Sequence, residues 1–120
     1  MTRRMLIVED ERDICECLQD FFQARGFEVG CAFSGEEALD RLARETVDVL
    51  LLDILLPGMS GLEVLRRAKE LYPGVRAVMV TGLAREELAV EARQYGAAGF
   101  VTKPFDFSED TWSAVLVEAA

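Results

Sequence analysis

The chain has 120 residues, a formal net charge of −9 and 51% hydrophobic residues, with three cysteines and no histidine. This length predicts one domain, residues 1–120, which buries roughly two-thirds of its unfolded surface. The acidic charge repels phosphate backbones and argues against direct nucleic-acid binding. The absence of histidine excludes imidazole metal ligands and Ser-His or Cys-His nucleophilic pairs.

Two further classes are excluded by the pattern of apolar residues and cysteines. No apolar run approaches the roughly 18 residues that a membrane span needs, and the apolar run after the basic start is too short for a signal peptide. We therefore expect a cytoplasmic protein that does not enter a membrane. Cys15, Cys17 and Cys31 lack the spacing of a zinc site, so they are interpreted as small buried side chains.

Apolar runs and amphipathic segments alternate along the chain. Short apolar runs predict strands at residues 5–8, 27–31, 47–52, 77–81 and 99–102. Apolar positions at helical spacing predict helices whose buried faces span residues 14–22, 38–42, 64–72, 88–95 and 112–119. The pattern is therefore a strand followed by a helix, five times over.

The ends of several predicted helices carry their own signals. Ser34 with Glu37 and Ser60 with Glu63 have the spacing of capping boxes at helix starts. Glycines and a Pro-Gly pair end the first, third and fourth helices at Gly26, Pro73-Gly74 and Gly96. Asp106 or Ser108 is predicted to cap the last helix.

Strict alternation of strands and helices predicts an α/β fold with a parallel sheet and right-handed crossovers. The chain is too short for an eight-stranded barrel. We therefore predict a (βα)5 doubly wound, flavodoxin-like sheet with strand order 2-1-3-4-5. In this order a crevice opens between strands 1 and 3, at the loops that follow Val8 and Leu52.

Polar residues lie at the ends of four of the five predicted strands. Glu9 and Asp10 follow the first strand, Asp53 follows the third, Thr81 ends the fourth and Lys103 follows the fifth. Parallel strands bring their carboxyl ends to one edge of the sheet, so these side chains are expected to converge there. Each has a simpler explanation when taken alone, such as a helix-dipole contact for the two acids or a solvated lysine.

The combination of these residues predicts a specific chemistry. Three carboxylates in one crevice repel each other unless a cation or a proton intervenes. An all-oxygen cluster suits a hard cation, above all Mg²⁺, which commonly also binds phosphate oxygens. Lys103 and Thr81 would then supply a charge and a hydrogen-bond donor to a phosphoryl group, and Asp53 is a potential nucleophile for an aspartyl phosphate.

The same residues carry a family resemblance over essentially the whole chain. The sequence resembles the receiver domain of bacterial two-component response regulators. The segments that carry the resemblance are Val8-Glu9-Asp10-Glu11, Leu52-Asp53-Ile54-Leu55-Leu56-Pro57-Gly58-Met59-Ser60-Gly61, Val80-Thr81-Gly82 and Gly99-Phe100-Val101-Thr102-Lys103-Pro104-Phe105. Each segment is weak evidence alone, and the ordered set is specific.

The resemblance implies a role for each matching residue of the acidic cluster. Asp53 matches the phospho-acceptor, Asp10 the acid that binds Mg²⁺ directly, and Glu9 its neighbour, which acts through a metal-bound water. Asp53 and the backbone carbonyl of Leu55 would be further metal ligands. Lys103 matches the lysine that contacts the phosphoryl group, and its bond to the following proline is expected to be cis.

The resemblance also implies a conformational switch. Thr81 matches the switch hydroxyl and Phe100 the switch aromatic residue. Thr81 would move toward the phosphoryl group and Phe100 would rotate into the vacated space, which changes the surface formed by residues 88–95, 99–102 and 112–119. Without the other residues, Phe100 would be interpreted as an ordinary buried aromatic residue of a strand.

The implied partners are a histidine kinase or phosphotransfer protein as phosphoryl donor, and a downstream output domain or protein. Phosphorylation-dependent homodimerisation is a further possibility. The chain is not expected to be an enzyme beyond catalysing its own phosphorylation and dephosphorylation. In the family, residues two positions after the phospho-acceptor and the switch hydroxyl flank the path of hydrolytic water. These residues are Leu55 and Leu83 here, which predicts a slow loss of the phosphoryl group.

Three alternatives are weighed against this interpretation. A flavodoxin-like cofactor binder would need a phosphate-binding loop after strand 1, where Glu9-Asp10-Glu11 stands instead. An aspartyl-phosphate phosphatase would need a second acid two residues after its nucleophile, where this chain has Leu55. A receiver-like interaction module that works without phosphorylation remains, although the complete set of site residues argues against it.

Overall fold

The computed structural model describes residues 2–116, which form a five-stranded sheet and five helices. The strands are β1 (Arg4–Val8), β2 (Glu28–Ala32), β3 (Val49–Leu52), β4 (Arg76–Thr81) and β5 (Gly99–Thr102). The helices are α1 (Arg12–Gln23), α2 (Gly35–Arg44), α3 (Gly61–Leu71), α4 (Glu86–Gln94) and α5 (Ser113–Leu116). Each predicted strand and helix therefore has a counterpart within the described residues.

All neighbouring strands are parallel, and their order is β2-β1-β3-β4-β5. This confirms the predicted doubly wound α/β fold. β3 is the central strand, and its four residues are all buried, because helices cover both faces of a parallel sheet. The strand is shorter than the predicted run, since residues 47 and 48 precede its ladder.

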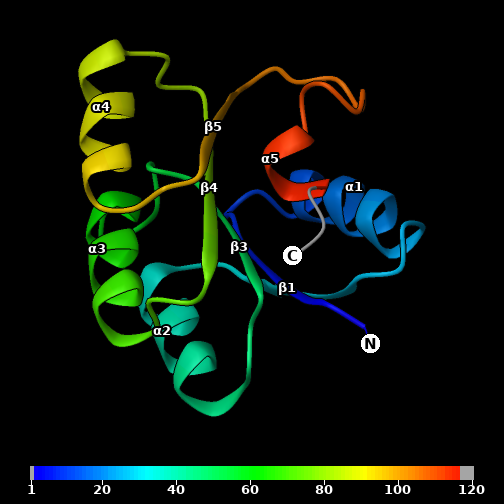
Figure 1. Cartoon of the computed structure of the whole chain (residues 1–120), viewed down its shortest axis with the longest axis horizontal. Helices are drawn as coiled ribbons and strands as arrows, with labels where there is room; N and C mark the ends of the chain where they lie inside the picture. The colour runs from blue at the N-terminus through cyan, green and yellow to red at the C-terminus, as the bar shows by residue number, and fades with distance from the viewer. Residues whose placement is uncertain (1, 117–120) are drawn as a thin grey trace.

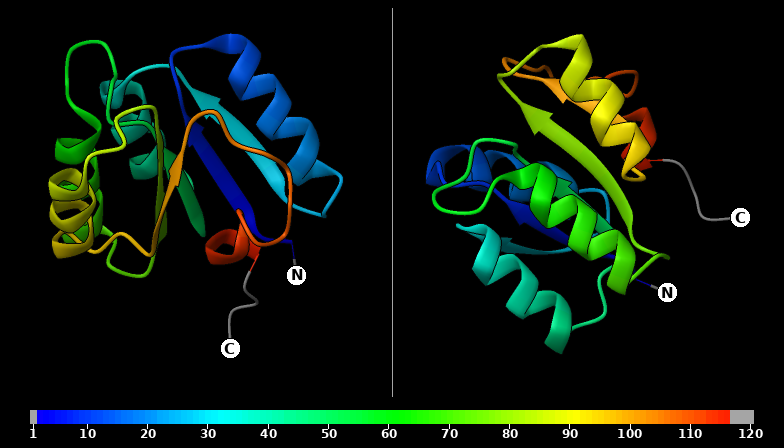
Figure 2. Two further views of the ribbon diagram at one scale, coloured as in Figure 1. Left: turned by 90° about the horizontal axis from the view of Figure 1, so that it is seen from above. Right: turned by 90° about the vertical axis from the view of Figure 1, so that its left-hand side faces the viewer.

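Alternate strand residues point to opposite faces of the sheet and build two separate cores. One face packs against α2, α3 and α4, and the other against α1 and the α5 region (Figures 1 and 2). The first core includes Leu6, Val8, Leu50, Leu52, Ala77 and Met79 from the strands. The second includes Met5, Ile7, Val49, Leu51, Val78 and Val80.

The prediction of buried positions was wrong at two helix residues. Cys17 was placed on the apolar face of α1, but it is exposed, while Cys15 is buried. Positions two apart differ by about 200° around a helix, so Cys15 and Cys17 cannot both face the sheet. Leu71 is 65% exposed, because it is the last residue of α3. Cys31 is partly buried, so only one of the three cysteines fits the predicted burial.

The two predicted capping boxes differ in the structure. At α2, Ser34 Oγ accepts a hydrogen bond from the Glu37 backbone N–H at 3.2 Å, and the Glu37 carboxylate accepts one from the Phe33 N–H. At α3, Ser60 Oγ accepts from the Leu62 N–H. In a capping box, the Glu63 carboxylate would accept a hydrogen bond from the backbone N–H of Ser60. This bond is absent among the described contacts, because the carboxylate pairs with Arg66 and Arg67 instead.

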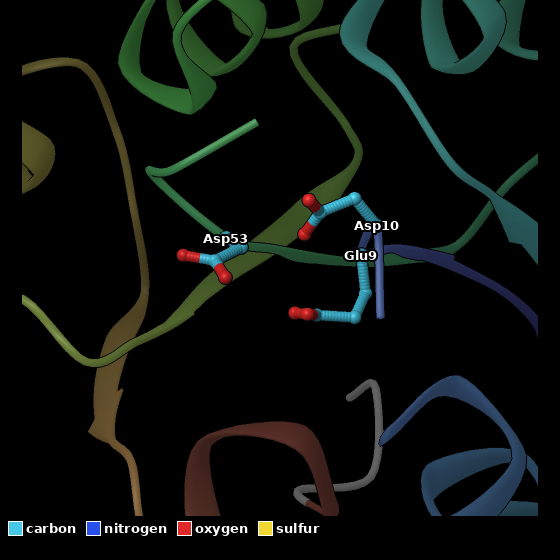
Figure 3. A group of neighbouring side chains, drawn as sticks. All are labelled: Glu9, Asp10 and Asp53. Atoms are coloured by element: carbon cyan, nitrogen blue, oxygen red, sulfur yellow. The ribbon is translucent and has the colours of Figure 1, made fainter. Parts of the chain in front are cut away.

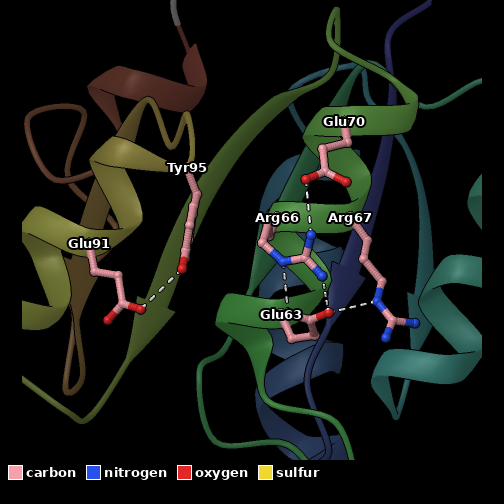
Figure 4. Close-up of polar contacts among 6 residues, drawn as sticks. All are labelled: Glu63, Arg66, Arg67, Glu70, Glu91 and Tyr95. Carbon is pink, nitrogen blue, oxygen red and sulfur yellow. Dashed lines mark hydrogen bonds and ion pairs between the residues drawn. The ribbon is translucent and has the colours of Figure 1, made fainter.

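Glu63 is the centre of an exposed ion-pair network on α3 (Figure 4). It pairs with Arg66 and with Arg67, and Arg66 also reaches Glu70 at 2.9 Å. The hydrogen bonds from Arg66 and Arg67 lower the pKa of Glu63 to about 2. Exposed pairs of this kind contribute little each, so the network orders the α3 surface rather than holding the fold.

The last helix begins later than predicted. Ser108 Oγ and Asp106 cap a turn, with the Thr111 N–H donating to Ser108 Oγ at 3.2 Å and the Ser108 N–H donating to Asp106 at 3.0 Å. The described part of α5 then begins at Ser113. The predicted apolar position at Ala119 lies outside the described residues.

Trp112 fixes this turn to the second core. Its ring is fully buried and meets the rings of Phe22 and Phe105 edge to face, with centroids 5.4 and 5.1 Å away. Its Nε1–H donates to the Asp106 carbonyl oxygen at 2.7 Å. Aromatic contacts therefore tie the segment after β5 to α1.

Gly61, the first residue of α3, is required by a close approach of two backbones. A Cβ at this position would lie 1.8 Å from the carbonyl oxygen of Asp53. The Gly61 N–H donates to the Ile54 carbonyl at 2.9 Å, which holds the loop after β3 against the start of the helix. Only a residue without a side chain allows this contact.

We predict that Gly61→Ala lowers the free energy of unfolding by about 3 kcal/mol or more, because the overlap is with backbone atoms that cannot rotate away. The control is Gly74→Ala, where an added Cβ meets no atom within 4 Å. That variant should change stability by no more than about 1 kcal/mol. Urea denaturation of both variants provides the measurement, and equal stabilities would contradict the argument.

Candidate functional site

Three carboxylates meet at the carboxyl ends of β1 and β3, where the crevice was predicted. Oxygen atoms of Glu9, Asp10 and Asp53 lie within 4.8 Å of one another (Figure 3). Glu9 and Asp53 are only 2% and 5% exposed, whereas Asp10 is exposed. The cluster is therefore a partly buried site that solvent reaches from the side of Asp10.

The parallel ladder between β1 and its neighbours places the two buried acids. Val8 and Leu52 are the last paired residues of β1 and β3. The Asp53 N–H donates to the Val8 carbonyl at 3.1 Å, and the Glu9 N–H donates to the Ala32 carbonyl at 3.0 Å. Each acid thus extends the hydrogen-bonded sheet by one residue, which gives its side chain a fixed starting position.

Lys103 bridges the two buried acids. Its Nζ donates to Glu9 Oε2 and to Asp53 Oδ2, both at 2.8 Å. The Lys103 backbone N–H donates to the Thr81 carbonyl at 2.8 Å, and the Lys103-Pro104 peptide bond is cis, as expected from the resemblance. Burial opposes the charged form of this lysine, but the hydrogen bonds to Asp53 and Glu9 outweigh it and raise the pKa of Lys103.

Glu9 has a strongly perturbed pKa. Burial raises the pKa of Glu9 to about 7, and the hydrogen bond and charge of Lys103 only partly oppose this effect. The negative charge of Asp53 adds to the increase. Near neutral pH the protonated form of Glu9 is therefore populated, which is the expected response of a carboxylic acid to burial.

The donor set fits a hard divalent cation. All three clustered side chains offer carboxylate oxygens, and Mg²⁺ favours oxygen ligands while keeping several waters. Within residues 2–116, every buried side-chain nitrogen or oxygen atom has a hydrogen-bond partner. Lys103 therefore satisfies the two buried acids in this structure, and a cation bound near Asp10 would add a second positive charge to the cluster.

The loop after β3 holds the second oxygen of Asp53. Asp53 Oδ1 accepts a hydrogen bond from the Leu55 N–H at 3.1 Å, while Oδ2 faces Lys103. The side chain of Leu55 is 57% exposed. The carboxylate is thus fixed by one backbone donor and one ammonium group.

Thr81 lies on β4, next to β3, and Phe100 lies on β5, the following strand of the sheet. Thr81 is completely buried, and its Oγ1 accepts a hydrogen bond from the Leu83 N–H at 3.3 Å. Phe100 pairs with Met79 in the β4–β5 register and packs, partly buried, against the core under α4. Thr81 ends β4 at the same edge of the sheet as the acids, while Phe100 lies deeper in its strand.

Two features of the site were not predicted from the sequence. The bond between Lys103 and Glu9 joins residues 94 positions apart, and only the closed sheet brings them together. The requirement for Gly61 depends on the path of the backbone near Asp53. The glycine itself was visible in the segment Pro57–Gly61, but nothing local indicated which atom it approaches.

Comparison with known proteins assigns the family. A sequence profile described as "Response regulator receiver domain" matches residues 5–111. The chain belongs to this family. Receiver domains are signalling domains that accept a phosphoryl group, so the resemblance inferred from the sequence is confirmed.

Solved structures agree with the assignment. A CheY-like receiver domain protein from Methanospirillum hungatei is 34% identical, with a TM-score of 0.86 over 89% of this chain and 86% of that chain. The BeF3-activated receiver domain of DrrB, a Thermotoga maritima protein, is 30% identical, with a TM-score of 0.82 over 89% of both chains. A Burkholderia pseudomallei response regulator, solved with a phosphorylated aspartic acid, calcium ion and citrate, is 25% identical, with a TM-score of 0.87 over 95% and 67%.

Across residues 2–116, the receiver domain has no helix long and apolar enough to cross a membrane.

The raised pKa of Glu9 predicts a pH dependence of stability in metal-free protein. The unfolded glutamate titrates near 4.5 and the folded one near 7, so the folded state binds more protons between these values. The free energy of unfolding should therefore fall as pH rises from about 4.5 to 7. Glu9→Gln, which cannot ionise, should remove this decline, as measured by urea denaturation at a series of pH values in EDTA.

The two other acids with perturbed pKa values do not interfere in this window. The depressed pKa values of Glu63 and Asp106, both about 2, affect stability below pH 4.5 and with the opposite sign. Glu16→Gln, a change at an exposed glutamate of α1, controls for the loss of a surface charge. Equal pH profiles for wild type and Glu9→Gln would contradict the assignment.

Proposed function

We propose that Asp53 accepts a phosphoryl group from a histidine kinase or phosphotransfer protein in a Mg²⁺-dependent reaction. The observation that carries this proposal is the position of its carboxylate, 2.8 Å from Lys103 Nζ and within a cluster of three acids. The 25% identical Burkholderia protein carries a phosphorylated aspartic acid, and DrrB is activated by BeF3, which supports phosphoryl chemistry in relatives of this fold.

Asp10, Asp53 and the backbone carbonyl of Leu55 would hold the Mg²⁺ ion, with Glu9 bound to it through a water molecule. The ion supplies positive charge that offsets the repulsion between the carboxylates and an incoming phosphoryl group. The exposure of Asp10 beside two buried acids leaves this side of the cluster open to a hydrated cation. The resemblance and the oxygen-rich environment support the metal-binding role proposed for these four residues.

The residues of the chain position the nucleophile. In the transfer, an oxygen of Asp53 forms a bond to phosphorus, and the bond from phosphorus to the donor's imidazole nitrogen breaks, leaving the donor with that electron pair. The Leu55 N–H already holds Oδ1, and Lys103 holds Oδ2. Lys103 must exchange at least one of its carboxylate partners for the new phosphoryl oxygens, which places its charge on the product.

Thr81 and Phe100 are proposed to convert phosphorylation into a change of surface. Thr81 would exchange its contact with the Leu83 N–H for a bond to the phosphoryl group. Phe100, which is only partly buried, would then rotate toward the vacated space and alter the surface of α4, β5 and α5. Phosphorylation would favour one of two existing arrangements of this surface. An output domain or protein would bind the favoured arrangement.

The proposed function involves the whole chain. Residues 1–120 would act as a single receiver domain in the cytoplasm, with no direct contact to nucleic acid and with phosphorylation-dependent homodimerisation as one possible output. Its catalysis would be limited to its own phosphorylation and dephosphorylation. A receiver-like interaction module that needs no phosphoryl group is the competing function, and the labelling experiment below separates the two.

We expect incubation with acetyl phosphate and Mg²⁺ to add one phosphoryl group, seen as a single adduct by intact mass spectrometry. Asp53→Asn and prior addition of EDTA should abolish the adduct, because the acceptor or its charge compensation is lost. Asp20→Asn, a change at an exposed aspartate of α1, should label like wild type. No adduct, together with no Mg²⁺ binding by calorimetry, would favour the interaction module.

The two leucines beside the site predict a long-lived phosphoryl group. Leu55→Asn should speed its loss at least about threefold, which corresponds to about 0.7 kcal/mol of activation free energy, because a polar side chain can guide water to the phosphorus. Leu71→Asn is the matched control, since Leu71 is similarly exposed but lies at the far end of α3. Equal decay rates for Leu55→Asn and wild type would contradict the prediction.

A further inference from the structure

β2 is an edge strand of the sheet and carries backbone groups that no neighbouring strand uses. The Glu28 N–H donates to the Arg3 carbonyl, and the Ala32 carbonyl accepts from the Glu9 N–H. By the alternation of a parallel ladder, Glu28, Gly30 and Ala32 direct their backbone groups toward β1. Val29 and Cys31 therefore direct theirs outward, where a further strand could pair.

Side chains of α2 reach over to this outward edge. Glu37, Arg41 and Glu45 follow each other at spacings of four residues, and therefore lie in one row along and just beyond the helix. Arg41 Nη1 donates to the outward carbonyl of Cys31 at 3.1 Å. The Glu37 carboxylate accepts from the Phe33 N–H, the next outward donor along the chain, at 3.3 Å.

Glu45 and Gly30 hold the Arg41 side chain across the strand. Glu45 Oε2 lies 3.3 Å from Arg41 Nε and Nη2, so it fixes the plane of the guanidinium. A Cβ on Gly30 would lie only 2.5 Å from Arg41 Nη2. The guanidinium thus covers the strand at the one residue of β2 that has no side chain.

We propose that this arrangement, which we call the edge clamp (Glu37, Arg41 and Glu45), closes β2 against pairing with β2 of a second copy of this chain. A two-fold antiparallel pair would join Val29 of one copy to Cys31 of the other, with the two Gly30 residues at its centre. The pairing is self-complementary, and the two Gly30 residues place no side chains on the faces of the sheet at its centre. It requires the Cys31 carbonyl that Arg41 occupies.

Steric and electrostatic costs keep such a pair from forming while the clamp is in place. The incoming strand would have to displace the guanidinium from Gly30 and from the Cys31 carbonyl. Repulsion between two copies of a chain with net charge −9 opposes the pair with or without the clamp, so the clamp variants need a high concentration to associate. Removal of Arg41 leaves the outward groups of Val29 and Cys31 accessible and takes away the barrier at the centre of the edge.

The test compares the unphosphorylated full chain with two clamp variants by sedimentation velocity over a range of concentrations. Wild type should remain at one chain mass. Arg41→Ala, and to a smaller extent Glu45→Gln, which releases the guanidinium without touching the strand, should move toward two chain masses as concentration rises. Hydrogen exchange of the Val29 and Cys31 amides in Arg41→Ala should slow at least about tenfold in the associated sample.

Arg44→Ala is the matched control, because Arg44 lies on the same helix but pairs with Asp40 instead of contacting β2. It should sediment like wild type. If Arg41→Ala folds poorly, Glu45→Gln carries the test alone. The proposal is overturned if the clamp variants remain monomeric at all concentrations, or if they associate without slower exchange at Val29 and Cys31.

Discussion

The contact of Lys103 with Glu9 and Asp53 is the interaction on which the site depends. Three carboxylates at one edge of a sheet repel each other, and a partly buried ammonium group at 2.8 Å from two of them makes the cluster compatible with folding. Burial raises the pKa of Glu9 to about 7, and the negative charge of Asp53 adds to this increase. Under the proposed function, Lys103 would exchange one of these carboxylate partners for a phosphoryl oxygen.

The fold places the acidic residues mainly by fixing the backbone at the ends of the strands. Parallel strands bring their carboxyl ends together, so residues that lie far apart in sequence meet at one edge. Gly61 holds the loop after β3 against the backbone of Asp53, and the Leu55 N–H fixes one oxygen of that carboxylate. The aromatic contacts of Trp112 fix the segment that follows Lys103. Contacts with other elements therefore hold both sides of the acidic edge, which would suit the phospho-acceptor role proposed for Asp53.

The two edge strands of the sheet, β2 and β5, have different surroundings. Among the described elements, β5 borders the surface proposed to change on phosphorylation, and β2 is crossed by side chains from α2. If the edge clamp has the role proposed for it, one helix row protects the sheet from uncontrolled pairing while the opposite edge stays available for signalling. Both assignments rest on where strand order places these edges, which no single element determines.

The sequence by itself determined the order of strands and helices, the buried strand that leads to Asp53, and the gathering of Glu9, Asp10 and Lys103 near it, because these follow from periodicity and from the geometry of parallel sheets. It misplaced Cys17, since an apolar residue near a helical stripe need not face the core. Only the tertiary structure decided that Lys103 bonds to Glu9, that Gly61 meets the Asp53 backbone and that Arg41 crosses Gly30. Each of these contacts joins separate elements at atomic distance, and local patterns carry no information about such distances.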